Sequence, residues 1–323
     1  MRIFVTGGSG FVGGHVLERL SKQHDVRALA RSDAAAKVVE GFGARAVRGD
    51  LGSLDARTIG DAEVVVHAAA WVRLWGRRAD FVEGNVEGTR RALEAARAAG
   101  ARRFIHVSTE AVLFAGQDLL DVDESTPFPA RQRFLYSETK AEAERLVRAA
   151  NAPGFTTLAL RPRLVWGARD ATALPAILEA VEKGAFAWLD GGTQRTSTTW
   201  VGNLAAAIEL ALTRGNGGEA YFIADEGTRT TREFFTALAA TRGVRLPARS
   251  LPGALARPVA ALVEATWRLF APRARPPMDA FSVSLLSRSV TLNTDKARRE
   301  LGYRPETTVE QGLALLSQRG ETT

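Results

Sequence analysis

The feature that most constrains the fold is a glycine-rich turn near the N-terminus. A β-branched run from Ile3 to Thr6 leads directly into Gly7, Gly10 and Gly13, and a segment with helical periodicity follows. Residues without a Cβ allow a tight turn and a close approach of ligand phosphates, and the last glycine lets the helix pack closely. Free N–H groups at the helix start favour a phosphate there. The order strand, turn, helix therefore predicts a dinucleotide-binding βαβ unit.

Strand-like and helical segments then alternate through the first half of the chain. Strands are predicted at 3–6, 26–30, 44–47, 64–67, 104–107 and 157–160, with helices at 11–21, 81–99 and 137–150. This order predicts an α/β fold with a doubly wound parallel Rossmann sheet. In such a sheet ligands bind at the carboxyl ends of the strands, so we expect functional residues in the loops that follow them.

The alternation loosens after Pro162, and proline-rich stretches at 246–258 and 272–277 divide the rest of the chain. We therefore expect a smaller, mostly helical C-terminal substrate lobe. It comprises residues 166–195 and 226–323, and the dinucleotide domain comprises 1–165 and 196–225. Within the lobe, residues 255–270 carry an apolar stripe at helical spacing, made of Val259, Leu262, Val263, Trp267 and Phe270. Packing against the substrate cleft is the favoured interpretation of this stripe, and peripheral membrane contact is the alternative.

Composition narrows the class of protein. The chain has 323 residues, 46% of them hydrophobic, which is enough for a sizeable core. Its net charge of +7 is spread without a run of five like charges, which favours a solvated surface over nucleic-acid binding. There is no cysteine, and the four histidines lack metal-ligand spacing, so we expect no metal. Without a secretory pattern or about 18 consecutive apolar residues, the prediction is a soluble cytoplasmic protein.

The end of the second strand indicates which nicotinamide cofactor binds. A carboxylate at this place would accept hydrogen bonds from a ribose 2′-hydroxyl and repel a 2′-phosphate, but the chain has Arg31 and Ser32 instead. NADPH or NADP+ is therefore favoured over NADH, although Asp33 lies nearby. The other expected contacts follow strands one, three and four: Gly7, Ser9, Gly10, Phe11, Val12, Gly13, Asp50, Leu51, His67, Ala68 and Ala69. For His67, packing at the strand end is the more ordinary interpretation.

A tyrosine and a lysine four residues apart form the candidate catalytic pair. Tyr136 and Lys140 fall on one face of a predicted helix. A phenol with a pKa near 10 exchanges protons poorly at neutral pH unless a nearby cation lowers that pKa, and Lys140 is such a cation. The strand before this helix ends in Ser108 and Thr109, and either hydroxyl can donate to a substrate carbonyl as negative charge develops on its oxygen.

These motifs together resemble an extended short-chain dehydrogenase/reductase. The resemblance rests on the glycine turn, on Ser108 and Thr109, on Tyr136 with Lys140, and on the run 160–162. Segments 199–205 and 293–303 are similar to the 3β-hydroxysteroid dehydrogenase and dihydroflavonol reductase branch. The resemblance implies that Thr109 is the hydroxyl donor, Tyr136 the general acid, and Lys140 the residue that lowers the tyrosine pKa and binds the nicotinamide ribose. It also implies a cofactor contact at Pro162. For Asn85 the resemblance implies first a structural role, supporting the strand that carries Thr109, and second a place in a proton relay. Related enzymes are commonly homodimers, which makes a homodimer one option here.

Large aromatic residues follow several strands at the expected ligand edge. Trp71, Trp75, Phe114 and Trp166 together suggest an apolar pocket, although each singly is as well explained by core packing. Where many nucleotide-sugar enzymes of this family have Val-Tyr-Gly, the chain has Val112, Leu113 and Phe114. We therefore expect hydride transfer to or from a carbonyl or secondary alcohol of a hydrophobic small molecule such as a steroid, flavonoid, polyketide or β-keto compound. A nucleotide-sugar epimerase or dehydratase with tightly bound NAD and a nonenzymatic dinucleotide sensor are the alternatives.

Overall fold

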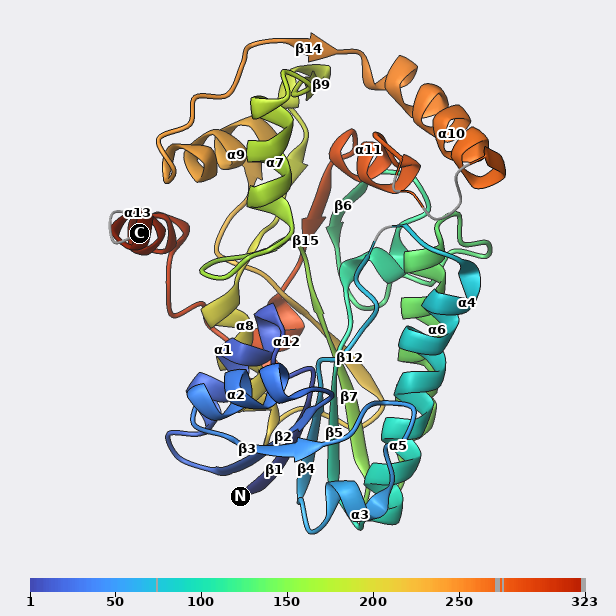
Figure 1. Cartoon of the computed structure of the whole chain (residues 1–323), viewed down its shortest axis with the longest axis vertical. Helices are drawn as coiled ribbons and strands as arrows, with labels where there is room; N and C mark the ends of the chain where they lie inside the picture. The colour runs from blue at the N-terminus through green and yellow to red at the C-terminus, as the bar shows by residue number, and fades with distance from the viewer. Residues whose placement is uncertain (74, 271–273, 275, 321–323) are drawn as a thin grey trace.

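A computed structural model describes residues 1–73, 75–270, 274 and 276–320, and its centre is a seven-stranded parallel sheet (Figure 1). The strands are β1 (Arg2–Thr6), β2 (Asp25–Ala30), β3 (Arg45–Arg48), β4 (Val64–His67), β5 (Arg103–Val107), β7 (Thr156–Pro162) and β12 (Glu219–Ile223). Their order is β3-β2-β1-β4-β5-β7-β12, so the chain winds outward from β1 in both directions. The predicted doubly wound sheet is confirmed, and β12 adds a strand that the sequence patterns did not indicate. A ligand site is expected where the winding reverses, between β1 and β4.

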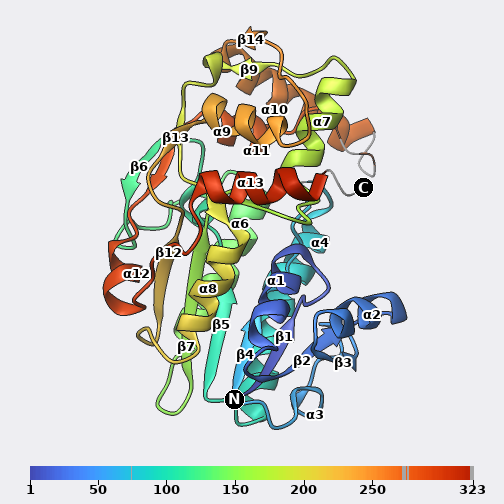
Figure 2. The ribbon, with the colours of Figure 1, turned by 90° about the vertical axis from the view of Figure 1, so that its left-hand side faces the viewer.

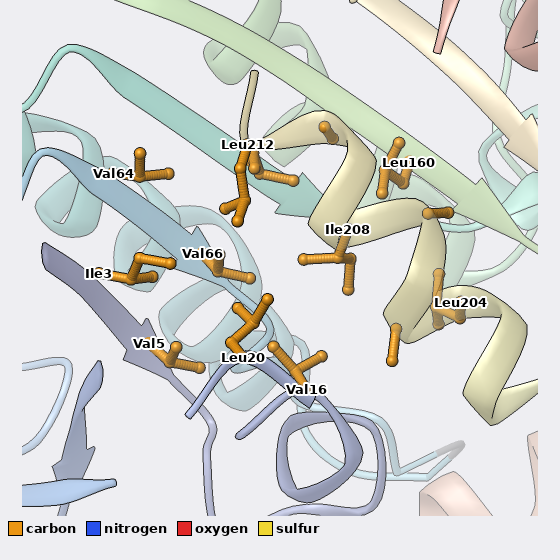
Figure 3. Close-up of a cluster of buried hydrophobic side chains, with 14 of the residues drawn as sticks. Ile3, Val5, Val16, Leu20, Val64, Val66, Leu160, Leu204, Ile208 and Leu212 are labelled. Carbon is orange, nitrogen blue, oxygen red and sulfur yellow. The ribbon is translucent and has the colours of Figure 1, made fainter. Parts of the chain in front are cut away.

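Alternating side chains of the strands form a core on each face of the sheet. Ile3 and Val5 of β1 face α1 (Phe11–Leu20) and α8 (Val201–Ala211), as Figure 3 shows. Phe4 points to the other face, which is covered by α3 (Ala56–Ile59), α5 (Gly88–Ala98) and α6 (Leu135–Ala149). Side chains that alternate along a strand point to opposite faces, and both faces are apolar here because helices cover both.

Most of the remaining elements form a smaller lobe beyond the carboxyl ends of the strands (Figures 1 and 2). Its sheet, in the order β13-β10-β15-β6, contains β13 (Arg229–Thr230), β10 (Arg195–Thr196), β15 (Val290–Leu292) and β6 (Leu119–Val122). Two short parallel pairs add β8 (Val165–Trp166) with β11 (Thr199–Trp200), and β9 (Trp188–Leu189) with β14 (Ser250–Leu251). The lobe helices are α7 (Ala173–Glu182), α9 (Thr231–Ala240), α10 (Gly253–Phe270), α11 (Ala280–Leu286) and α13 (Val309–Gly320).

Two segments depart from the predicted domain boundaries. β6 comes from the predicted dinucleotide domain but pairs with β15 in the small sheet. Conversely α12 (Asp295–Glu300) packs against β12, and Ala297, Leu301 and Tyr303 belong to the core of the large sheet. The Tyr303 hydroxyl donates to the Ala224 carbonyl at 3.0 Å, which fixes this segment there. Short apolar segments pack wherever a complementary face is available, and that face can lie far away in the sequence.

Helix α10 corrects the favoured interpretation of the apolar stripe. Its packed edge consists of small residues, Ala256 and Ala260, which lie against α11. Val259, Leu262 and Phe270 are instead 52%, 68% and 82% exposed. The other two stripe residues, Val263 and Trp267, are half-buried. The close approach of α10 to α11 needs small side chains, so the stripe does not form the packed edge. Within the part of the chain that the structure describes, no helix combines the length and apolar character needed to cross a bilayer.

Candidate active site

The glycine turn forms a cradle in which side chains would not fit. Gly7 has φ +76°, and a Cβ there would lie 2.7 Å from the Ala69 backbone nitrogen. A Cβ on Gly13 would lie 2.0 Å from the Gly7 carbonyl oxygen. Gly10 begins α1 without a side-chain cap, so the N–H groups of the first turn have no competing side-chain acceptor. The turn thus presents main-chain donors and a helix N-terminus at the carboxyl end of β1, where Ser9, Phe11, Val12, Ala68 and Ala69 surround it.

The segment after β2 carries the two residues proposed to select the cofactor. Arg31 is exposed, and its guanidinium has no recorded partner among the described residues. Ser32 caps α2 (Asp33–Gly41), where its hydroxyl accepts a hydrogen bond from the Ala35 N–H at 3.2 Å. Asp33 forms an ion pair with Arg48 at 3.4 Å. Among the described residues, the Arg31 guanidinium at the end of β2 therefore has no recorded partner, whereas the nearby Asp33 carboxylate is paired with Arg48.

Two of the predicted cofactor residues already use their polar groups within the protein. The Asp50 carboxylate accepts hydrogen bonds from the Gly52 and Ser53 N–H groups at 2.8 and 2.9 Å, which lower its pKa. His67 is buried, with its ring nitrogens 2.7 Å from the Thr6 hydroxyl and 3.0 Å from the Thr89 hydroxyl. Burial lowers the pKa of His67 to about 3, so its ring stays neutral. The imidazole is thus a packing residue, and only its main chain can take part in cofactor binding.

Helix α6 positions Tyr136 and Lys140 against the end of β5. Lys140 is buried, and its Nζ donates to the Val107 carbonyl at 2.7 Å and lies 3.4 Å from His106 Nε2. Burial lowers the pKa of Lys140 to about 8, although the Glu144 carboxylate opposes this shift. The Tyr136 pKa is raised by burial and by the Glu110 carboxylate, and a hydrogen bond with Thr109 opposes that rise. These opposing effects make both groups sensitive to charge brought into the site.

The structure separates the two candidate hydroxyls at the end of β5. Ser108 Oγ donates to Glu144 Oε2 at 2.6 Å, within an ion pair between Glu144 and Arg161. Thr109 faces the other way and hydrogen-bonds with Tyr136. Successive residues of an extended chain point in opposite directions, so only one of the two can lie beside the phenol. That residue is Thr109, for which the donor role stays a prediction.

Asn85 lies close to the site but supports a different segment from the one expected. It belongs to a π-helical segment, Val82–Glu87, that joins α4 (Arg78–Phe81) to α5. Its Oδ1 accepts from the Trp71 N–H at 2.7 Å, and its Nδ2 donates to the Thr139 hydroxyl at 3.0 Å. Asn85 therefore joins the chain after β4 to helix α6, and its side-chain bonds do not hold β5.

Two of the four aromatic residues proposed for the substrate pocket are core residues. Trp166 is fully buried, and its indole N–H donates to Asp225 Oδ2 at 2.9 Å. Phe114 is also fully buried and stacks on Phe134 with ring centroids 5.8 Å apart. Both predictions were wrong because position after a strand does not determine whether a side chain turns inward. Trp75 is also buried, at 8% exposed, with the Arg268 guanidinium 4.8 Å from its ring. Only Trp71 of the four is half-buried, and the Arg73 guanidinium lies 5.4 Å from its ring.

Three further residues at the site belong to none of the sequence motifs and were not predicted. Phe281 of α11 lies against the Tyr136 ring, with centroids 5.7 Å apart. Glu110 and Arg163 form a buried ion pair next to Thr109. Phe281 comes from a helix about 145 residues downstream, which periodicity cannot connect to Tyr136. The available signal for a buried pair was that Glu110 precedes the apolar run 111–114 and Arg163 precedes the apolar run 164–166.

Comparison with known proteins agrees with this geometry. Residues 4–253 match the model of the 3-beta hydroxysteroid dehydrogenase/isomerase family. Over 323 residues the chain is 46% identical to a 4-hydroxy-2-methyl-3-oxo-4-farnesyl-3,4-dihydroquinoline-1-oxide ketoreductase from Stigmatella aurantiaca, covering 99% of this chain and 97% of that protein. It is 33% identical to a 2-alkyl-3-oxoalkanoate reductase from Stenotrophomonas maltophilia, with 98% of each chain covered.

A solved structure has the same architecture along its whole length. The structure of gox2253 superposes with a TM-score of 0.77 at 28% identity, and 98% of each chain is covered. The family resemblance drawn from the motifs is therefore confirmed. The chain is an oxidoreductase of the extended short-chain dehydrogenase/reductase type and belongs to the 3-beta hydroxysteroid dehydrogenase/isomerase family.

Proposed function

We propose that this enzyme transfers a hydride between NADP(H) and a carbonyl or secondary alcohol of a hydrophobic small molecule. The observation that carries the proposal is the convergence of Thr109, Tyr136 and Lys140 beside the glycine cradle. Thr109 hydrogen-bonds with Tyr136, and Lys140 lies one helical turn along α6. A nonenzymatic sensor has no need of this arrangement.

The residues present fit a dinucleotide. A Cβ on Gly7 or Gly13 would clash with neighbouring main chain, so the turn keeps its backbone bare. Such a bare turn ahead of a helix N-terminus suits a pyrophosphate. Arg31 offers a guanidinium without a recorded partner among the described residues, and the Ser32 hydroxyl stands beside it; both suit a 2′-phosphate. We assign the ribose to Lys140, and expect the main chain of residues 67–69 and Pro162 to line the remaining surface. When bound, the nicotinamide supplies or accepts the hydride.

In the direction of reduction, Tyr136 is the general acid. Its phenol donates a proton to the carbonyl oxygen as negative charge develops there, and Thr109 offers a second hydrogen bond to the same oxygen. Lys140 lowers the cost of forming the phenolate through its positive charge. Because burial brings the Lys140 pKa to about 8, part of the lysine is uncharged at that pH, and its charging depends on the site. The reverse sequence of proton movements applies to alcohol oxidation.

A hydrophobic substrate is supported by the side chains around Tyr136 and by the relatives. Phe281 lies against the phenol, and Phe134 packs on Phe281. The relative from Stigmatella aurantiaca is a ketoreductase named for a farnesylated dihydroquinoline oxide, and that from Stenotrophomonas maltophilia is named for a 2-alkyl-3-oxoalkanoate. Both named compounds combine a ketone with an apolar chain, which is the chemistry we propose for this enzyme.

The deciding experiment is a substrate screen at the nicotinamide absorbance. Purified protein is given NADPH or NADH with a 3-oxosteroid, a 2-alkyl-3-oxoalkanoate or a prenylated 3-oxodihydroquinoline oxide, and UDP-glucose is the counter-probe. We expect protein that arrives without cofactor, prefers NADPH and oxidises it only when a ketone is added. Tightly bound NAD together with epimerisation of UDP-glucose would replace our proposal with the nucleotide-sugar alternative.

We further propose that the outer face of α10 rests on an anionic lipid surface. Leu255, Val259, Leu262, Leu269 and Phe270 lie on this face and are 52–82% exposed. The chain carries a net charge of +7, which favours an anionic surface over a neutral one. The opposite edge of α10 packs on α11, the helix that brings Phe281 to Tyr136. An apolar substrate dissolved in lipid would thus be close to the catalytic lobe.

A further inference from the structure

A buried ion pair beside Thr109 has no part in the proposed mechanism. Glu110 begins the 3-10 turn Glu110–Leu113 that follows β5, and Arg163 directly follows the last residue of β7. Arg163 Nη1 donates to Glu110 Oε1 at 2.5 Å, and the two side chains are 5% and 4% exposed. Burying two charges is costly unless all their polar atoms find partners, so the contacts of this pair are informative.

Both oxygens of the Glu110 carboxylate are occupied. Oε1 accepts from Arg163, and Oε2 accepts from the Thr109 hydroxyl at 2.8 Å. Arg163 is itself fixed, since its Nε donates to the Thr196 hydroxyl at 3.0 Å and its backbone N–H to the Thr199 hydroxyl at 3.1 Å. The carboxylate therefore cannot turn away from Thr109 without breaking a chain of buried hydrogen bonds.

The Thr109 hydroxyl has one proton, and this proton points at Glu110. The Thr109 oxygen then acts as an acceptor, as it does for the Ala111 N–H at 3.2 Å. Thr109 also hydrogen-bonds with the Tyr136 phenol. Glu110 thus competes with the phenol and with a substrate oxygen for the single proton that Thr109 can donate.

We propose that Glu110, held by Arg163, is a positioning residue that sets the direction in which the Thr109 hydroxyl donates. Between turnovers the proton points at the carboxylate, and the Thr109 oxygen accepts from the Tyr136 phenol. When negative charge develops on the substrate oxygen, the hydroxyl rotates and donates to it, without any covalent change in Glu110. This inference rests on the proposed function, because it takes Thr109 and Tyr136 as the groups that act on that oxygen.

The charge of Glu110 acts on Tyr136 in the same sense. The carboxylate raises the pKa of the phenol, so it favours the protonated form that reduction requires. In Glu110→Gln that charge is lost, and the new amide N–H can donate to Thr109 Oγ1. The Thr109 proton would then be directed at Tyr136, which stabilises the phenolate. Both effects lower the pH at which Tyr136 ionises.

The chain contains a matched control one residue away. Ser108 donates to Glu144 Oε2 at 2.6 Å, and Arg161 Nη2 donates to Glu144 Oε1 at 2.6 Å. This second set is also a hydroxyl, a buried glutamate and an arginine, but Thr109 takes no part in it. Glu144→Gln therefore reproduces the loss of a buried ion pair without a direct effect on the Thr109 proton. Because Glu144 raises the Lys140 pKa, this control is read in the additivity of the cycle and not in the pH profile.

The test is a double-mutant cycle on Glu110→Gln and Thr109→Val. For each variant, kcat/KM is measured as a function of pH for the oxidation of a secondary alcohol that the substrate screen has identified. The part of the pH profile in which the rate rises as Tyr136 ionises is called the tyrosine limb. We expect Glu110→Gln to move this limb to lower pH by about one unit, which is about tenfold in rate at a fixed pH on the limb. The effects of Glu110→Gln on rate should shrink strongly in the Thr109→Val background, whereas those of Glu144→Gln should add to those of Thr109→Val. An unmoved limb, or full additivity of Glu110→Gln with Thr109→Val, overturns the inference.

A second readout needs neither cofactor nor substrate. In protein with 13C-labelled glutamate carboxyls, the resonance missing from Glu110→Gln identifies Glu110, and this resonance should shift in Thr109→Val because the hydroxyl that donates to the carboxylate is lost. A Glu110 resonance that stays unmoved in Thr109→Val overturns the inference. If Glu110→Gln does not fold, Glu110→Gln/Arg163→Gln removes both charges and enters the same cycle with the same expected limb shift. Tyr136→Phe is run alongside: if that variant turns over at the parental rate, the proposed function itself fails.

Discussion

At the residue scale, the direction of the side chain decides which of two adjacent hydroxyls lies beside Tyr136. Ser108 and Thr109 are adjacent, yet one donates to Glu144 and the other lies against Tyr136. The Tyr136 pKa is raised, which suits a proton donor and makes phenolate formation depend on nearby positive charge. We propose that Lys140, one helical turn along α6, supplies that charge. Substitutions at Tyr136 and at Arg31, which we propose selects the cofactor, therefore test different parts of the proposed chemistry.

We expect Tyr136→Phe to lower kcat by at least about 10²-fold while NADPH affinity stays near that of the parent, because the phenol acts on the proton and not on the phosphates. Turnover and fluorescence titration of NADPH measure the two effects. Tyr221→Phe is the matched control, since it removes a hydroxyl that binds Glu300 on the far side of the sheet. Equal losses in both variants would point to a stability effect and argue against general acid catalysis by Tyr136.

For Arg31→Asp we expect NADPH affinity to fall by about tenfold or more and NADH to become the better cofactor. The substitution replaces a guanidinium with a carboxylate that repels a 2′-phosphate and accepts hydrogen bonds from a 2′-hydroxyl. Dissociation constants for both cofactors give the ratio. Arg97→Asp makes the same charge change at an exposed site on α5 and should leave the ratio unaltered. An unchanged ratio in Arg31→Asp would remove this residue from the phosphate site.

At the element scale, the glycine turn requires residues without a Cβ because its main-chain segments lie in direct contact. A Cβ at Gly13 would lie 2.0 Å from the Gly7 carbonyl oxygen, which is backbone and cannot move aside. We expect Gly13→Ala to weaken cofactor binding severely and to lower the melting temperature. Gly41→Ala, at the end of α2, meets nothing within 4 Å and should stabilise the protein by about 0.5–1 kcal/mol. Calorimetry with and without NADPH measures both, and normal cofactor binding by Gly13→Ala would contradict the cradle.

Helix α10 presents its larger apolar residues outward because its packed edge is built from alanines. If this face rests on lipid, the protein should sediment with phosphatidylglycerol vesicles more than with phosphatidylcholine vesicles. Leu262→Glu should reduce that binding strongly, because it places a charge in the middle of the face. Leu120→Glu is the control, since Leu120 is 64% exposed on β6. Failure of the parent to bind either vesicle would reject the lipid surface, and a change from dimer to monomer in Leu262→Glu would indicate self-association instead.

At the scale of the whole molecule, two stacked histidines make stability depend on acid. The rings of His67 and His106 lie 5.4 Å apart in the core, and burial lowers the pKa of both, to about 3 for His67. In the unfolded chain each histidine has a pKa near 6.5, so the unfolded state binds protons that the folded state rejects. Stability is therefore full above about pH 6.5 and is lost as the pH falls toward 3.

The expected loss from His67 between pH 7 and pH 5 is about 2 kcal/mol of unfolding free energy. Urea unfolding of the parent and of His67→Asn at the two pH values measures it, and the variant should lose less stability on acidification. Thr89→Val removes a hydrogen-bond partner of His67 without removing the titrating group, so it should be destabilised equally at both pH values. The same pH dependence in His67→Asn as in the parent would rule out this source of acid lability.

Local order along the chain determined the large sheet, the glycine turn and the Tyr136 and Lys140 pair. Each of these depends on neighbours within a few residues: alternation in a strand, the absence of a Cβ in a turn, or four-residue spacing on a helix. The six predicted strands are therefore recovered with small shifts in their ends, and α6 carries its two residues on one face. The family resemblance depended on the same local motifs.

Only the tertiary structure decided which residues meet across the chain. Trp166 and Phe114 turned into the core, Phe281 arrived at Tyr136 from α11, and Glu110 found Arg163 at the end of another strand. The direction of a side chain after a strand depends on what packs around it, and those partners are far away in the sequence. For the same reason the glycine turn could be predicted as a cofactor site, whereas the ion pair beside Thr109 became visible only in three dimensions.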